Sequence, residues 1–127
     1  MPVVVACSDK DESWKNSHIH MLKDAGFEIR HVHDKAFIMG DRSDTEEIEI
    51  LRGASAVLAR GERYSPQVLR SLPDLRVIAR LGVGFDRVDI EAATKLGIAV
   101  AITPSANHEA VAEHALALIL ALAKSLI

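Results

Sequence analysis

The sequence predicts an α/β fold, in which helices alternate with the strands of a parallel sheet. Three stretches, "LKDAGFEIRHV", "EILRGASAVLA" and "ATKLGIAVAI", each run from a helical segment through a glycine into a short, branched apolar run. Glycine suits this junction because it adopts the left-handed conformation that closes a helix without a steric penalty from Cβ. Short apolar runs spaced in this way are typical of βα units, and consecutive βα units build a parallel sheet.

Each element of that fold has its own local signal. Capping residues mark three helix starts: Ser43 has Glu46 at capping-box spacing, Ser65 precedes Pro66, and Asp89 precedes "IEAATKL". The segment at residues 34–42, "DKAFIMGDR", is expected to be an irregular connection. The expected strands lie at residues 3–6, 28–33, 56–59, 76–80 and 98–102. We therefore predict a flavodoxin-like, doubly wound parallel sheet of five strands, followed by an apolar C-terminal helix.

Composition limits the classes of function. The 127 residues, about half of them hydrophobic, suit one globular unit, and a net charge of -3 without a basic block argues against nucleic acid as a partner. No apolar run reaches the roughly 18 residues that a membrane span needs, so we expect a cytoplasmic protein without a membrane partner. His31 and His33 share one face of a strand, but no further ligands stand at metal-site spacing, and no metal is expected.

Ligands of such sheets bind beyond the carboxyl ends of the strands, which draws attention to the segment "RLGVGFD" at residues 80–86. A dinucleotide fingerprint would need a third glycine after Gly82 and Gly84, but Arg87 stands at that position. The loop is therefore not expected to hold a pyrophosphate. From the spacing alone, the two glycines favour a simple sharp turn, although backbone amides at a strand-to-helix turn also form a positive concavity that would suit a carboxylate.

The segment "LRVIARLGVGFDRVDIEAATKLGIAVAITPSANHEAVAEHALALILALA", residues 75–123, resembles the NAD-dependent D-isomer-specific 2-hydroxyacid dehydrogenases, most closely the D-3-phosphoglycerate dehydrogenase branch. The upstream segment "AVLARGERYSPQVL" fits the same family more loosely. The resemblance implies a substrate domain at residues 1–106 and, at residues 107–127, a crossover helix that leads into a Rossmann cofactor domain. The cofactor motif and the catalytic Arg, Glu and His of the family would lie downstream. We therefore expect no catalytic residue in this chain, no activity by itself, and no tight binding of NAD.

The resemblance also suggests which residues meet a small 2-hydroxy or 2-oxo acid. Val83 and Gly84 would contact the substrate, and Val83 also the nicotinamide side of the cofactor. Arg60, with Gly61, would face the acidic group, although the loop is one residue shorter than in the phosphoglycerate branch, so that Arg63 competes for this role. Asn107 would reach substrate or cofactor, or would cap the helix that follows it.

Other readings remain open beside the dehydrogenase. The chain could be a scaffold that binds small acids or dimerises without redox chemistry, and the uniformly apolar stretch within residues 108–126 predicts a homodimer through this helix. A response-regulator receiver would share the fold, but it needs a phosphoacceptor Asp where Ala59 and Arg60 stand. Which acid binds, and whether the chain is a natural short protein or a fragment, stay undecided by the sequence.

Overall fold

The computed structural model describes residues 1–8 and 17–126, and within these residues it has one five-stranded sheet. All strand pairs are parallel, and the strand order is β2-β1-β3-β4-β5. This is the flavodoxin-like order that the sequence predicts, with β1 near the centre and β5 at one edge. The strands are β1 (Val3–Cys7), β2 (Glu28–Val32), β3 (Ala54–Ala59), β4 (Val77–Arg80) and β5 (Ala99–Ala101).

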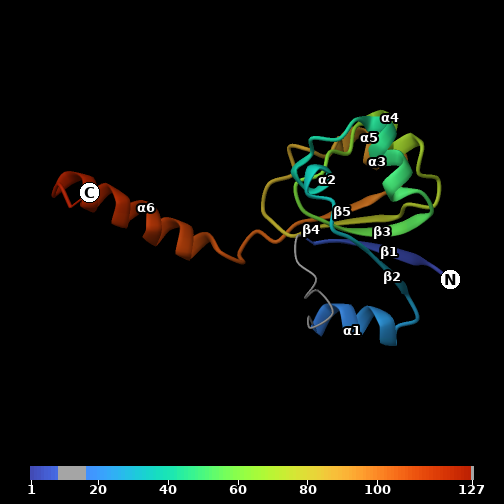
Figure 1. Ribbon diagram of the computed structural model, residues 1–127, viewed down its shortest axis with the longest axis horizontal. Coiled ribbons are helices and arrows are strands. Elements are labelled where there is room, and N and C mark those ends of the chain that lie inside the picture. Colours follow the sequence, from blue (N-terminus) through green and yellow to red (C-terminus); the bar gives the residue numbers. More distant parts are fainter. Residues whose placement is uncertain (9–16, 127) are drawn as a thin grey trace.

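Helices lie on both faces of the sheet. The helices α2, α3, α4 and α5 cover one face, α1 lies on the other, and α6 projects away from the sheet (Figure 1). The main core forms between the sheet and the four-helix layer, where Phe37, Leu51, Val57 and Leu69 are fully or almost fully buried. The helices are α1 (Ser17–Asp24), α2 (Lys35–Met39), α3 (Asp44–Leu51), α4 (Pro66–Arg70), α5 (Ile90–Lys95) and α6 (His108–Ala123).

The local signals of the sequence work as expected. Ser43 and Glu46 form a complete capping box at the start of α3. Ser65 and Asp89 accept hydrogen bonds from backbone N–H groups in the first turns of α4 and α5. The glycines at the three helix-to-strand junctions, Gly26, Gly53 and Gly97, all have positive φ, between 70° and 84°. Helix ends and strand starts were therefore readable from single residues.

The prediction for residues 34–42 was wrong, because this segment contains the short helix α2. The Asp34 side chain accepts from the Phe37 N–H at 3.1 Å, and Gly40 closes the helix in the left-handed conformation at φ 75°. Phe37 and Ile38 are buried in the core. The Asp and Gly at its two ends were the signals for this helix, which is too short for its apolar period to be recognised.

Two apolar surfaces remain uncovered among the described residues. Beside α1, the face of β3 and β4 borders an open hollow of about 480 Å³, whose lining includes Leu22, Phe27, Ala56 and Val77. The helix α6 has no buried residue, although its residues 115–123 are all apolar. No helix in the described part of the chain is long and apolar enough to cross a membrane.

Candidate functional site

The loops that follow β3 and β4 meet at the carboxyl edge of the sheet. Arg60 directly follows β3, and Leu81 directly follows β4. Together with Ser8 and His18, they line a small cavity of about 110 Å³. The Leu81 N–H donates to the carbonyl of Ala59 at 2.8 Å, which continues the β3–β4 pairing into the loop. The structure thus brings Arg60 next to the start of the segment "RLGVGFD", in a half-buried position.

The loop at residues 81–86 presents its surface to solvent. Leu81, Val83 and Phe85 are 54%, 55% and 48% exposed, which is high for large apolar side chains. The Thr103 N–H donates to the Gly82 carbonyl at 3.0 Å, so that the turn after β5 supports this loop. Nothing lies within 4 Å of the position that a Cβ on Gly82 would take. The backbone here is open to a ligand from the solvent side.

A buried carboxyl lies beneath Arg60. The Glu62 side chain is fully buried, and its Oε2 accepts from the Arg60 N–H at 2.6 Å. Burial raises the pKa of Glu62, whereas its hydrogen bonds and the Arg80 cation act in the opposite direction. Burial, and then the negative charge of Glu62, raise the pKa of the neighbouring Cys7 thiol. Cys7 is therefore a protonated core residue and not a nucleophile.

A second buried carboxyl belongs to α3. Glu47 is fully buried, and its Oε1 accepts from the Arg63 N–H at 3.2 Å, while its Oε2 has no partner within the described residues. Burial raises the pKa of Glu47 to about 7. The Tyr64 hydroxyl, buried nearby and also without a described partner, has its pKa raised by burial. Nothing in the sequence pattern marks these groups as buried, because α3 and the loop after β3 meet only through tertiary contacts such as the one between Arg63 and Glu47.

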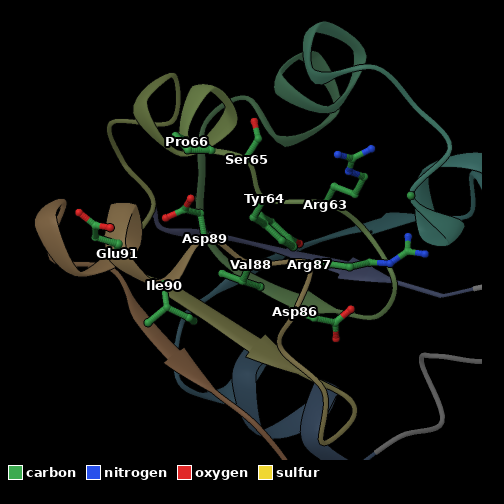
Figure 2. A pocket seen from close by; sticks show the side chains of 11 residues that line it. Arg63, Tyr64, Ser65, Pro66, Asp86, Arg87, Val88, Asp89, Ile90 and Glu91 are labelled. Atoms are coloured by element: carbon green, nitrogen blue, oxygen red, sulfur yellow. The ribbon is translucent and has the colours of Figure 1, made fainter.

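Arg63, the alternative to Arg60 for facing the acidic group of a substrate, lies at a different cavity. This open hollow of about 740 Å³ is lined by the loops before α4 and α5, by the first residues of these helices and by Gly40. Arg63 and Arg87 extend toward one side of it, and Asp89 and Glu91 stand on the other side (Figure 2). Asp86 lies on the same side as Arg87, apart from Asp89 and Glu91 (Figure 2). The structure thus separates Arg63 from the cavity that Arg60 and Leu81 share.

Asn107 occupies the N-cap position of α6 but does not cap it. The structure shows no hydrogen bond from its side chain to the first turn, and the residue is exposed. The capping role that the sequence allowed is therefore not seen. Asn107 also does not line the cavity that Arg60 and Leu81 share.

The turn between β4 and α5 does not fit the dinucleotide fingerprint. In the fingerprint, the third glycine lets a helix approach the sheet and its N-terminus receives the pyrophosphate. Here the Arg87 guanidinium donates to the carbonyls of Met39 at 2.6 Å and Gly61 at 2.8 Å. The N-terminus of α5 is satisfied by the Asp89 carboxylate, which accepts from the Ala92 N–H at 2.7 Å and would repel a phosphate. No pyrophosphate site exists at this turn.

Two histidines, His31 and His33, lie at the end of β2. The rings of His31 and His33 stack with their centroids 6.1 Å apart, so they share a face as the sequence predicts. His33 Nδ1 lies 2.9 Å from the Ser8 carbonyl. Among residues 1–8 and 17–126, no group of three or more His, Cys, Asp or Glu side chains is arranged to hold a metal ion.

Comparison with known proteins identifies the family. The family model described as D-isomer specific 2-hydroxyacid dehydrogenase, catalytic domain, matches residues 5–122, which is nearly the whole chain. The chain belongs to this family. The resemblance seen in residues 75–123 is thereby confirmed, and it extends over the upstream half of the chain as well. The loops at the carboxyl edge are those of a 2-hydroxyacid dehydrogenase domain.

Similar proteins support the assignment. A D-3-phosphoglycerate dehydrogenase of Mycobacterium leprae is 43% identical over 74 residues, which cover 58% of this chain and 14% of that protein. A glyoxylate reductase of Pyrococcus horikoshii is 35% identical over 113 residues, which cover 86% of this chain and 31% of that protein. The chain thus spans less than a third of either relative.

Solved structures show the same fold. The crystal structure of a Thermus thermophilus protein matches with a TM-score of 0.79 at 31% identity, over 99% of this chain and 38% of that one. The NAD+-bound 3-phosphoglycerate dehydrogenase of Entamoeba histolytica matches with a TM-score of 0.76 at 24% identity, over 94% of this chain and 38% of that one. The α/β fold of this domain is therefore shared with these longer chains.

Proposed function

We propose that this chain is the substrate-domain portion of an NAD-dependent D-2-hydroxyacid dehydrogenase of the phosphoglycerate dehydrogenase type. The observation that carries the proposal is the meeting of Arg60 with the start of the "RLGVGFD" loop at the carboxyl edge, in a chain that the family model covers from residue 5 to residue 122. In doubly wound folds, this edge is where ligands bind. Residues 1–106 would form the substrate domain, and residues 107–127 would lead toward a cofactor domain.

A small 2-hydroxy or 2-oxo acid is the proposed ligand. Arg60 would pair with the carboxylate through its planar guanidinium, and the backbone of Gly61, Val83 and Gly84 would surround the acid. Asn107 would approach from the start of α6. Because this edge is open to solvent, a single charge pair contributes only about 0–1 kcal/mol, and we expect an affinity no better than roughly millimolar.

NAD supplies the hydride acceptor or donor in this chemistry, and the described turn at residues 82–87 lacks the dinucleotide fingerprint. The cofactor would be bound by a separate domain, and Val83, which is 55% exposed, would then face its nicotinamide side. The chain alone would bind and orient the acid but would not transfer hydride. We therefore propose that it is inactive by itself and contributes no catalytic residue.

A second candidate function is a dimerising scaffold without redox chemistry. It is favoured by α6, a 16-residue helix with no buried residue and with Leu118, Ile119 and Leu122 between 46% and 67% exposed. Such a surface is rarely left in water. We propose that two copies of the chain form a dimer through residues 108–126. Such a dimer is compatible both with a dehydrogenase substrate domain and with a scaffold.

Amide NMR tests the acid site. Addition of D-3-phosphoglycerate to the labelled chain should shift the amides of residues 60–61, 83–84 and 107, with a half-saturation near the millimolar range. As a matched control, Arg70→Gln removes an exposed guanidinium on α4, away from the edge, and should leave the titration unchanged, whereas Arg60→Gln should weaken it severalfold. Shifts scattered over the surface, or none at all, would show that the edge is not an acid site.

A further inference from the structure

Three side chains hold the backbone of Arg60 and Gly61 at the carboxyl edge. The Arg60 N–H donates to Glu62 Oε2 at 2.6 Å, and the Arg60 carbonyl accepts from the Arg80 guanidinium. The Gly61 carbonyl accepts from Arg87 Nη1 at 2.8 Å. Because both the N–H and the C=O of Arg60 are bonded, the φ and ψ angles of this residue are restrained. The direction in which the Arg60 side chain leaves the backbone is therefore set by its neighbours.

Glu62 bonds the backbone of this loop from a fully buried position, where an apolar side chain would have a lower desolvation cost. Its carboxyl is fully buried, and burying a carboxyl is costly unless it is hydrogen-bonded. An apolar replacement would remove that cost but would leave the Arg60 N–H without its acceptor. A hydrogen bond from an N–H to a carboxylate is charge-assisted, and it is shorter and stronger than one between neutral groups. The contribution of Glu62 therefore lies in its bond to Arg60.

Arg80 and Gly61 complete the arrangement from other elements. Arg80 reaches the loop because it pairs in register with Ala59, the residue before Arg60. Gly61 has no room for a side chain, since a Cβ there would lie 2.6 Å from the Ile38 carbonyl oxygen. Through Arg87, which also donates to the Met39 carbonyl, the loop is joined to the end of α2. The conformation of the loop is thus fixed from β4, from α2 and from the buried carboxyl.

We propose that Glu62 and Arg80 are positioning residues that set the backbone of Arg60, and so the origin of its guanidinium, before an acid binds. The proposal deepens the function proposed above and rests on it for the nature of the ligand. If the loop were loose, acid binding would have to order the backbone as well as the long Arg60 side chain. A loop ordered in advance avoids this loss of freedom, so that the same contacts give a higher affinity.

The ligand-free test is amide NMR of the full 127-residue chain. Glu62→Gln replaces the carboxylate by a neutral acceptor of the same shape, so the Arg60 amide proton should move to lower frequency and exchange about tenfold faster. The matched control is Glu49→Gln, an exposed residue paired with Arg52, which should leave the Arg60 amide unchanged. If Glu62→Gln leaves the chemical shift and the exchange rate of the Arg60 amide proton unchanged, the proposal is overturned.

Two further readouts keep the test decisive if Glu62→Gln does not fold. The Arg60 amide of the unmodified chain should exchange slowly, and fast exchange there would refute the proposal. Arg80→Lys keeps the positive charge but removes the guanidinium that donates to the Arg60 carbonyl. It should therefore shift the amide nitrogen of Gly61, which senses the hydrogen bond to the Arg60 carbonyl. An unchanged Gly61 amide would equally count against a positioning role of Arg80.

The ligand arm uses D-3-phosphoglycerate as the probe. The apparent Kd should be severalfold higher for Glu62→Gln than for the unmodified chain and for Glu49→Gln. Equal affinity in all three would overturn the positioning role. If even the unmodified chain does not respond, the acid site proposed above is wrong. The ligand-free amide shifts then decide separately whether Glu62 and Arg80 hold the loop.

Discussion

At the scale of single residues, buried carboxyls are the unexpected feature of this dehydrogenase domain. Glu47 and Glu62 are both fully buried, on α3 and in the loop after β3. Each accepts a backbone N–H from that loop, of Arg63 and of Arg60 respectively, and each has one oxygen without a described partner. Two buried carboxyl groups thus hold the backbone of the loop after β3, in which the sequence analysis had singled out only Arg60, Gly61 and Arg63.

Glu47 should make the stability of the chain depend on pH. Its pKa is raised from 4.5 to about 7, because burial favours the protonated form. The folded state then binds more protons than the unfolded state between these values, so the free energy of unfolding should fall as the pH rises from about 4.5 to about 7. At about 1.4 kcal/mol per pH unit, the loss is at most on the order of 3 kcal/mol. Denaturant unfolding at a series of pH values measures it.

Glu47→Gln isolates this effect from other titrating groups. Since glutamine resembles the protonated carboxyl, the variant should match the unmodified chain near pH 4.5 and exceed its stability above pH 7. The exposed control Glu49→Gln should follow the unmodified chain at every pH. Parallel stability curves for Glu47→Gln and the unmodified chain would mean that Glu47 does not titrate in this range.

At the scale of elements, α6 is set apart from the rest. The shorter helices bury one side against the sheet or its loops, whereas α6 projects away from the sheet (Figure 1). Its residues 115–123 are all apolar, and none of its residues is buried. A helix that is apolar all round is normally covered on more than one side. At about 25 cal/mol per Å² of apolar surface, leaving several leucines in water costs several kcal/mol.

We expect the chain to self-associate through α6. Sedimentation of the unmodified chain should show a dimer, and the double variant Leu118→Glu with Leu122→Glu should shift it to a monomer, because charges cannot be buried between apolar helices. Met21→Glu on α1, where the native side chain is 71% exposed, is the control and should not change the oligomeric state. A monomeric unmodified chain at high concentration, with the double variant equally soluble, would contradict this expectation.

At the scale of the whole molecule, the chain spans only part of its relatives. It covers 14% of the mycobacterial D-3-phosphoglycerate dehydrogenase and 38% of the NAD+-bound structure from Entamoeba histolytica. The described residues contain the loops that follow β3 and β4 at the carboxyl edge, and the turn after β4 lacks the third glycine of a dinucleotide fingerprint. Hydride transfer needs a bound nicotinamide, a general acid or base and a group that polarises the substrate, all held in one geometry.

The isolated chain should therefore show no NAD-dependent oxidation of D-3-phosphoglycerate or D-lactate. Absorbance of NADH at saturating acid and NAD measures this, with the mycobacterial D-3-phosphoglycerate dehydrogenase as the positive control. Rates should stay at background even at high protein concentration. Steady NADH formation that disappears in Asn107→Ala would refute the expectation, because it would require a complete active site in this chain.

The sequence alone determined the fold class, the strand order and the family. These follow from short-range signals: glycines at helix ends, the capping residues Ser43, Ser65 and Asp89, and the continuous segment at residues 75–123. The single residue Arg87, at the position of the third glycine, breaks the dinucleotide fingerprint. The sequence pattern did not reveal α2, because five residues are too few to show a helical period.

Only the tertiary structure decided how the loops meet. It placed Arg60 beside Leu81 and Arg63 at another cavity, and it showed Asn107 without its capping bond. It also revealed that Arg87 reaches the carbonyl of Gly61, 26 positions away in sequence. The physical reason is that helices, caps and strands depend on neighbours within a few residues, which a sequence displays directly. Loop conformation and the pKa of a buried carboxyl depend on groups brought together by the folding of the whole sheet.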